Sequence, residues 1–192
     1  MVNRMQKKVA NEQKIKKMIK RFKMRVPLYS ESGKLVAVMT EDRVIAIVSD
    51  ENWDFSDCEL IDRADFTWKD EVWQNFKIWK YAKVKVTLRK KHFLNAINDI
   101  RTKCGLPYAF RLDATGIHID YPDMQAVELW PNNAVEVNDD LLWERSDYRA
   151  DYLYNIIRSL PGSVLTLGWQ KDGILSIKTD QSPLVLLAPI VY

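Results

Sequence analysis

The sequence predicts an α+β protein in which amphipathic helices pack on antiparallel strands. Three segments, 14–23, 89–104 and 148–160, carry apolar residues at helical spacing. The segments between them are short, alternate apolar with polar residues, and are separated by turns rich in Gly, Pro and Asn, which is typical of strands. With 192 residues and 47% apolar content, the chain is long enough to bury a core.

The first predicted element is a helix over residues 14–23. Its apolar residues recur at i, i+3, i+4 and i+7 and form one stripe: Ile15, Met18, Ile19 and Phe22. The other side chains are basic: Lys14, Lys16, Lys17, Lys20, Arg21 and Lys23. Such a helix suits a nucleic-acid face, a membrane surface or a solvated outer face. We expect it to break near Pro27, because proline disfavours helix in the residue before it.

Charge is distributed unevenly along the chain. Residues 1–25 hold ten Lys or Arg and one Glu, whereas the whole chain has a net charge of only +3, so the remainder is net acidic. A basic arm on an acidic body fits a phosphate-facing surface combined with an outer surface that repels nucleic acid. A solvated or partly disordered terminus is the alternative interpretation.

A β region and an aromatic connector follow the basic helix. The pattern becomes strand-like from Met24, and the runs 35–39 and 44–48 flank a four-residue loop, which predicts a hairpin. Residues 49–70 are expected to form a loop with one or two strands. Residues 71–81 combine Lys77 and Lys80 with several aromatic residues and are expected to connect two halves of the protein.

The segment 83–104 begins a more regular pattern. Alternation predicts a strand at 83–88, and helical spacing predicts a helix at 89–104 that ends at Gly105 and Pro107. Four predicted strands follow, divided by turn residues: 108–113, 117–121, 125–130 and 134–143.

A second helix and three strands complete the predicted domain. We expect Ser146 or Asp147 to cap the helix 148–160. Its predicted buried stripe consists of Tyr148, Tyr152, Leu153, Ile156, Ile157 and Leu160. The closing strands are predicted at 164–169, 174–179 and 184–191, with a tight turn at 170–173 between the first two. Residues 83–192 therefore have the predicted order β-α-β4-α-β3.

This order and three sequence phrases resemble the DNA sliding clamps, the family of proliferating cell nuclear antigen and the bacterial β-clamp. The phrases are Tyr148-x-x-x-Tyr152-Leu153-x-x-x-Ile157, Leu186-Leu187-Ala188-Pro189, and the hairpin from Gly33 to Ala46. The resemblance implies a complete clamp-like domain at 83–192. It also implies a shortened clamp-like half at 1–82, made of the basic helix, a partial β region and the aromatic connector.

The resemblance implies a DNA polymerase processivity factor that tethers DNA enzymes to duplex DNA and is not itself an enzyme. In such proteins basic helices approach phosphates without reading bases. The corresponding residues here are Lys14, Lys16, Lys17, Lys20, Arg21, Lys23, Arg89, Lys90, Lys91, Arg101, Lys103, Arg149 and Arg158. All three predicted helices are net basic on these bounds.

A hydrophobic client pocket is also implied, between the connector and the C-terminal tail. The corresponding residues are Trp73, Phe76, Trp79, Tyr81, Ala188, Pro189, Ile190, Val191 and Tyr192. The expected partners are duplex DNA, a DNA polymerase or other client, a clamp loader, and further copies of the chain in a homo-oligomer. For any single aromatic residue here, a core or edge-covering role is the alternative.

Other chemistry has little support in the sequence. His92 and His118 stand in unrelated contexts, no metal-ligand, Walker or dinucleotide motif is present, and we expect no cofactor and no metal. A carboxylate nuclease is the enzymatic alternative, because its metal ligands need no fixed local spacing. Cys58 and Cys104 are expected to be reduced thiols. Without a secretory signal or an apolar run of membrane-spanning length, we expect no membrane partner and a cytoplasmic location, either nucleoid-associated or in a host cell.

Two other functions stay open at this point. One is a monomeric, non-ring processivity factor that binds DNA directly through its basic face. The other is a clamp-fold interaction module that engages proteins and has no DNA function. Oligomeric state and the salt dependence of DNA binding would separate them.

Overall fold

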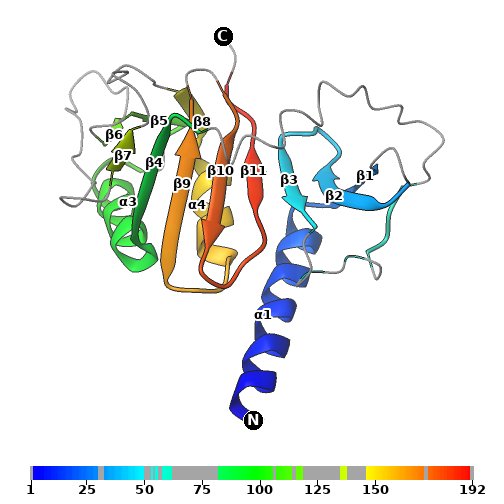
Figure 1. The fold of residues 1–192 in the computed structure, drawn as a ribbon. Coiled ribbons are helices and arrows are strands. Elements are labelled where there is room, and N and C mark those ends of the chain that lie inside the picture. Colours follow the sequence, from blue (N-terminus) through cyan, green and yellow to red (C-terminus); the bar gives the residue numbers. More distant parts are fainter. Residues whose placement is uncertain are drawn as a thin grey trace.

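The computed structural model describes residues in the N-terminal, central and C-terminal parts of the chain. The described residues are 2–29, 33–49, 53, 55, 58–61, 82–105, 107–113, 116–118, 135–137, 146–170 and 173–190. Figure 1 shows the arrangement of these segments. The connector residues Trp73, Phe76, Trp79 and Tyr81, the expected strand 125–130, and the terminal Val191 and Tyr192 lie outside them.

Helices and antiparallel strands make up the described fold, which confirms the predicted α+β class. The helices are α1 (Val2–Arg21), α3 (Lys90–Cys104) and α4 (Ala150–Ser159). The strands are β1 (Met24–Tyr29), β2 (Leu35–Thr40), β3 (Ile45–Val48), β4 (Val84–Arg89), β5 (Ala109–Leu112), β6 (Ile117–His118), β7 (Val135–Val137), β8 (Ser146–Arg149), β9 (Val164–Trp169), β10 (Leu175–Thr179) and β11 (Val185–Leu187).

The main sheet has eight strands in the order β1-β2-β3-β11-β10-β9-β4-β7, with antiparallel neighbours throughout. Strand β3 pairs with β11, and Ile47 lies opposite Val185. This pairing joins the N-terminal strands to the C-terminal ones in a single sheet. A second sheet of three strands, in the order β6-β5-β8, lies between α3 and α4 along the chain.

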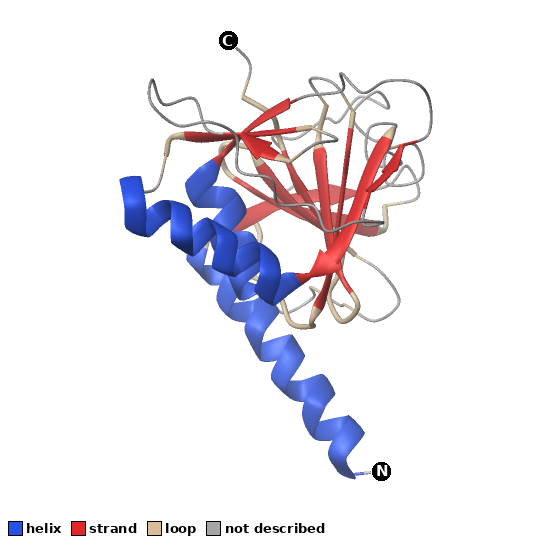
Figure 2. Cartoon of the chain, turned by 90° about the vertical axis from the view of Figure 1, so that its left-hand side faces the viewer, coloured by secondary structure: helices blue, strands red, loops and turns tan. Residues whose placement is uncertain are grey.

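The helices lie together on one side of the strands, as Figure 2 shows. The main core is between these two layers and draws residues from each helix, for example Met18 of α1, Phe93 of α3 and Ile157 of α4. A smaller cluster covers the opposite face of β1, β2, β3 and β11: Val26, Met39, Ala46 and Leu186. These strands are apolar on both faces, because successive side chains of a strand point to opposite sides.

Local sequence accounts for several element boundaries. In β4, Val84, Val86 and Leu88 are buried, and this alternation matches the predicted strand. Gly105 at the end of α3 has a φ of 79°, and its N–H donates to the carbonyl of Arg101. The predicted stop at Gly105 is therefore confirmed, since a positive φ favours glycine. Pro27 lies within β1, an edge strand of the sheet, where a missing N–H is tolerated.

The start of α4 differs from the prediction. The helix begins at Ala150, its N-cap residue is Arg149, and no side chain caps it. Ser146 and Asp147 therefore do not cap the helix, and Tyr148 is a buried residue of β8 rather than of the helical stripe. Tyr148 and Tyr152 are four residues apart, which is helical spacing, although Tyr148 lies in β8 and only Tyr152 lies in α4.

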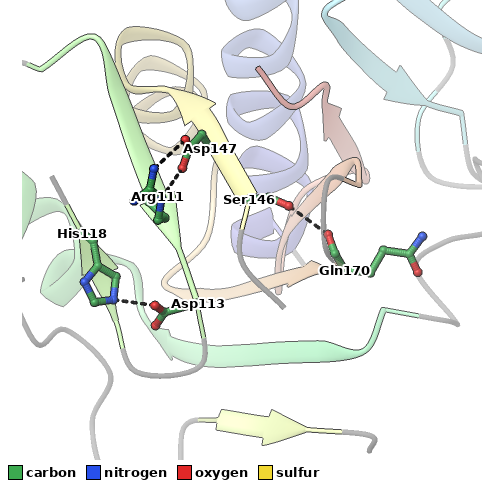
Figure 3. A network of polar contacts seen from close by, with 6 residues as sticks. All are labelled: Arg111, Asp113, His118, Ser146, Asp147 and Gln170. Atoms are coloured by element: carbon green, nitrogen blue, oxygen red, sulfur yellow. Dashed lines mark hydrogen bonds and ion pairs between the residues drawn. The ribbon is translucent and has the colours of Figure 1, made fainter. Parts of the chain in front are cut away.

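Polar contacts explain why residues 146–149 are a strand (Figure 3). The guanidinium of Arg111 on β5 donates to both carboxylate oxygens of Asp147, at 2.8 and 3.1 Å. The Ser146 hydroxyl donates to the carbonyl of Gln170, and Nε2 of His118 lies 2.7 Å from a carboxylate oxygen of Asp113. The Arg111 and His118 contacts lie within the three-stranded sheet, whereas the Ser146 contact links β8 to the residue that follows β9 of the main sheet. Together they use the two side chains that were expected to cap α4.

From residue 83 onward, the described elements have the order β-α-β4-α-β3, as predicted, but the four central strands are not the predicted four. Strand β8 is additional, and the expected strand 125–130 lies outside the described residues. Of the expected strand 134–143, residues 135–137 form β7. The last predicted strand, 184–191, is shorter, because β11 ends at Leu187.

Candidate nucleic-acid interface

The three helices form a layer with α4 in the centre. The Arg21 guanidinium donates to Oδ1 of Asn155 at 2.6 Å, which joins the end of α1 to the middle of α4. On the other flank, the Tyr154 hydroxyl donates to Oδ1 of Asn98 on α3 at 3.0 Å. The Lys90 ammonium at the start of α3 donates to the carbonyl of Leu160, just after α4. Phe22, just after α1, meets Tyr152 near the start of α4, so both flanking helices run antiparallel to α4.

Helix geometry divides the basic residues of α1 into two groups. Lys14, Lys17 and Arg21 follow at i, i+3 and i+7 and lie on one side of the helix. This is the side toward α4, because Arg21 contacts Asn155. Lys16 and Lys20 are four residues apart and lie on the other side. All five side chains are exposed, as is Lys23, which follows the helix.

The start of α3 brings a second set of cations to the layer. Burial lowers the pKa of the Lys90 ammonium, and the nearby charge of Lys14 lowers it further, whereas Asp180 acts in the opposite direction. Lys14 and Lys90 therefore bring positive charge from α1 and α3 into one area. Lys91 is exposed, and Arg89 is an exposed residue at the end of β4, one residue before α3.

The other end of α3 also carries exposed cations, Arg101 and Lys103. The Arg101 guanidinium lies 5.6 Å from the centre of the Tyr154 ring on α4. Between the two ends, the exposed positions of α3 include Asn95, Asn98 and Thr102. Asp99 is exposed as well, so the middle of α3 presents amide, hydroxyl and carboxylate groups between its basic ends.

Helix α4 is less basic than the sequence predicted. It contains one acid, Asp151, and one base, the exposed Arg158, so its own charge is balanced. Arg149 lies in β8, and its guanidinium donates to both carboxylate oxygens of Asp151, at 2.9 and 3.1 Å. The hydrogen bond that Arg149 donates to Asp151 raises the pKa of Arg149. The prediction that all three helices are net basic is therefore wrong for α4.

The predicted client residues that the structure describes are Ala188, Pro189 and Ile190, all half-buried. The N–H of Ala188 donates to the carbonyl of Val44 at 2.8 Å, and the N–H of Ile190 donates to the carbonyl of Asp147 at 2.8 Å. The tail therefore runs from the main sheet to the three-stranded sheet. The rest of the predicted client site lies outside the described residues.

Two residues of this layer were not singled out from the sequence. Asn155 places an amide on the exposed side of α4. The sequence feature that could have identified it is its position three residues before Arg158, on the same face of the helix. Tyr108 lies between α3 and β5 with 69% of its surface exposed. Its position in a predicted strand gave no sign of this exposure.

Two features are absent from the described residues. They contain no group of three or more His, Cys, Asp or Glu side chains that could hold a metal ion. Among the described helices, none has the length and apolar character needed to cross a membrane.

Solved structures similar to this chain include DNA sliding clamps and β subunits of DNA polymerase. The β subunit of DNA polymerase from Streptococcus pyogenes matches with a TM-score of 0.46 and 10% identity, covering 85% of this chain and 44% of that one. Proliferating cellular nuclear antigen from Entamoeba histolytica matches with a TM-score of 0.47 and 15% identity, covering 81% and 60%. A putative DNA polymerase III β subunit from Eubacterium rectale matches with a TM-score of 0.49 and 14% identity, covering 81% and 41%.

The chain thus covers between 41% and 60% of the length of these three structures. At 10–15% identity, the likeness concerns the fold alone. No protein-family model matches the sequence, and no curated protein matches it significantly.

Proposed function

We propose that this chain is a sliding-clamp-like processivity factor that tethers a DNA polymerase or another DNA enzyme to duplex DNA and catalyses no reaction itself. The observation that carries the proposal is the helix layer, in which exposed cations from different helices lie on one side of the sheet. They are Lys14, Lys17 and Arg21 of α1, Lys91 and Arg101 of α3, and Arg158 of α4.

The chemistry of this layer suits the phosphate backbone of DNA. Lysine and arginine neutralise phosphates whatever the base sequence, and the counterions that they release make such binding weaken with salt. Phosphate contacts position a protein on DNA without carrying sequence information. The layer is built from regular helices packed on a sheet, so the backbone positions that carry its cations are fixed before binding.

Tethering also needs a contact with the client enzyme. We propose that the connector aromatics Trp73, Phe76, Trp79 and Tyr81 and the tail from Ala188 to Tyr192 form this contact. The support is the half-buried apolar character of Ala188, Pro189 and Ile190 at a junction between two sheets. A short client segment with aromatic or aliphatic anchors would suit such a site.

A homo-oligomer that encloses DNA is the assembly that we propose, with a clamp loader among the candidate partners. The test combines light scattering with binding to closed circular and linear duplexes. A ring predicts a discrete oligomer that is retained on closed circular DNA and slides off linear ends. Retention on circular DNA that persists after the circle is cut contradicts sliding.

The same measurements decide between the proposal and its rivals. A monomer that binds short linear duplexes, with affinity falling steeply as salt rises, supports the non-ring processivity factor. No binding to either DNA at low salt overturns a DNA function and leaves the protein-interaction module. Where DNA binding is found, a polymerase assay with and without this protein measures tethering. Tethering predicts longer products for each binding event.

A further inference from the structure

A cluster of aromatic rings and one arginine lies where the helix layer ends. The Arg149 guanidinium is 4.2 Å from the centre of the Tyr152 ring and 5.8 Å from the centre of the Tyr108 ring. Tyr152 in turn meets Phe22, at the end of α1, edge to face with 6.1 Å between ring centres. The end of α1, the start of α4 and the segment after α3 therefore meet in one cluster, with Tyr108 as its exposed member.

The cluster is held in place by contacts that do not involve the face of Tyr108. Arg149 is fixed by its two hydrogen bonds to Asp151. The N–H of Ala150 donates to the Tyr108 carbonyl at 3.0 Å, which fixes the backbone that carries the ring. The Tyr152 hydroxyl contacts Asp42 of the β2–β3 turn at 3.3 Å. Tyr108 is therefore an exposed aromatic ring on an ordered support.

An exposed ring beside a guanidinium has the chemistry of a base-stacking site. Each nucleobase has a flat π-face that stacks on tyrosine, and the contact tolerates any base. Within a duplex both faces of a base are covered by its neighbours, so only an unpaired or terminal base can stack on such a ring. Arg101 and Lys103, at the end of α3 that leads to Tyr108, supply cations for the adjoining phosphates.

We propose that Tyr108, backed by Arg149, binds an unpaired base of a single strand that continues from duplex DNA lying on the helix layer. The inference rests on the proposed function, because the duplex delivers the strand. The ligand at this end of the helix layer is then single-stranded nucleic acid. The junction between duplex and single strand would then be located near the start of α4.

The test compares a blunt duplex with the same duplex carrying a single-stranded tail that contains 2-aminopurine. Full-length protein is titrated into each, and affinity is measured by anisotropy and stacking by quenching of the 2-aminopurine fluorescence. We expect tighter binding to the tailed duplex, with quenching. In Tyr108→Ala the increment from the tail should fall roughly tenfold and the quenching should disappear, because base stacking on an aromatic ring is lost.

Two controls make the result specific. Tyr108→Phe keeps the ring and should retain both the increment and the quenching. Affinity for the blunt duplex should be the same in all three proteins. If the native protein binds the blunt duplex but gains nothing from the tail, or if Tyr108→Ala keeps the gain, the stacking site is wrong and the proposed function stands. If neither DNA binds, the stacking site and the proposed function are both overturned. If Tyr108→Ala keeps the gain from the tail but loses binding to a client protein, the stacking site is wrong and Tyr108 contacts a protein.

Discussion

Helices α1 and α4 cover the same sheet but divide two tasks between them. Helix α4 is short and buries Ala150, Leu153, Tyr154, Ile156 and Ile157, while its single acid and single base balance. Helix α1 has 20 residues, and only its second half reaches the core, through Ile15, Met18 and Ile19. Its first half extends beyond the sheet with Met5 and Val9 exposed (Figure 1).

The contrast shows that stability and charge are separated in this layer. The central helix provides apolar burial, at about 25 cal/mol for each Å² removed from water. The flanking helix provides exposed cations, and such charges contribute little to stability. Substitutions in the two helices should therefore affect different measurements.

The largest effect is expected from α4. Leu153 is fully buried, so Leu153→Ala removes core contacts and leaves a cavity, which should lower the free energy of unfolding by about 2–5 kcal/mol. Val9→Ala is the matched change on α1. Val9 is half exposed, and its loss should stay within about 0.5 kcal/mol. Denaturant unfolding of both variants measures the difference, and equal losses would contradict the division of tasks.

The next effect is expected from α1 and concerns DNA. The triple variant Lys14→Ala, Lys17→Ala and Arg21→Ala removes the cations on the side toward α4. Each lost phosphate contact should make the slope of log affinity against log salt shallower by about 0.9, with little change in melting temperature.

The control removes the same charge from other positions, with Lys16→Ala, Lys20→Ala and Lys23→Ala. If DNA recognises only net charge, the two triple variants will weaken binding equally, and the assignment of the interface to one side of α1 is then wrong. A loss confined to the first variant places the DNA over α4.

A smaller effect is expected where the tail crosses β8. Ile190→Asn keeps the backbone hydrogen bond to Asp147 and removes apolar surface, so it should weaken binding of a polymerase-derived peptide and leave DNA affinity unchanged. Circular dichroism checks that the variant is folded. Normal peptide affinity in a folded variant would exclude Ile190 from the client site.

The smallest effect concerns the turn that follows α4. Burial acts to raise the pKa of Asp180, but hydrogen bonds from the N–H groups of Ser163 and Val164 outweigh it, and the pKa lies below its ordinary value. A carboxylate with a lowered pKa stabilises the fold above its unfolded pKa and loses this contribution as pH falls through the folded value. Asp180→Asn should therefore be less stable than the native protein at neutral pH, and the gap should narrow progressively as the pH falls below about 4. A gap that is unchanged in acid would contradict this account.

The sequence predicted the buried parts of the helices and most described strands because their periodicity reflects burial on one face. Helix α1 begins at Val2 and ends at Arg21, whereas the prediction was 14–23, because the described side chains of its first half form no buried stripe to reveal it. The β2–β3 hairpin and α3 have close to their predicted limits. Residues 146–149 were assigned to a cap and a helix because their strand conformation depends on distant partners, such as Arg111 for Asp147. Periodicity within a short window does not contain that information.

The candidate interface was predictable in composition but not in geometry. The sequence identified basic residues on three segments, yet which side of α1 faces α4 depends on the Arg21 contact with Asn155. The pairing of Arg149 with Asp151, two residues away, was visible in the sequence only as two opposite charges. The exposure of Tyr108 depends on how the segment after α3 meets the start of α4.

The pairing of β3 with β11 also imposes an order on folding. Strand β3 gains its hydrogen-bonded neighbour on this side only when β11 arrives, and most of the chain lies between the two strands. Contacts between such distant segments form slowly, because a long loop must close first. During synthesis the β1–β2–β3 segment therefore emerges with an open apolar edge at β3. A chain that stalls before β11 presents this edge to any other unpaired strand, which makes incomplete chains prone to aggregation.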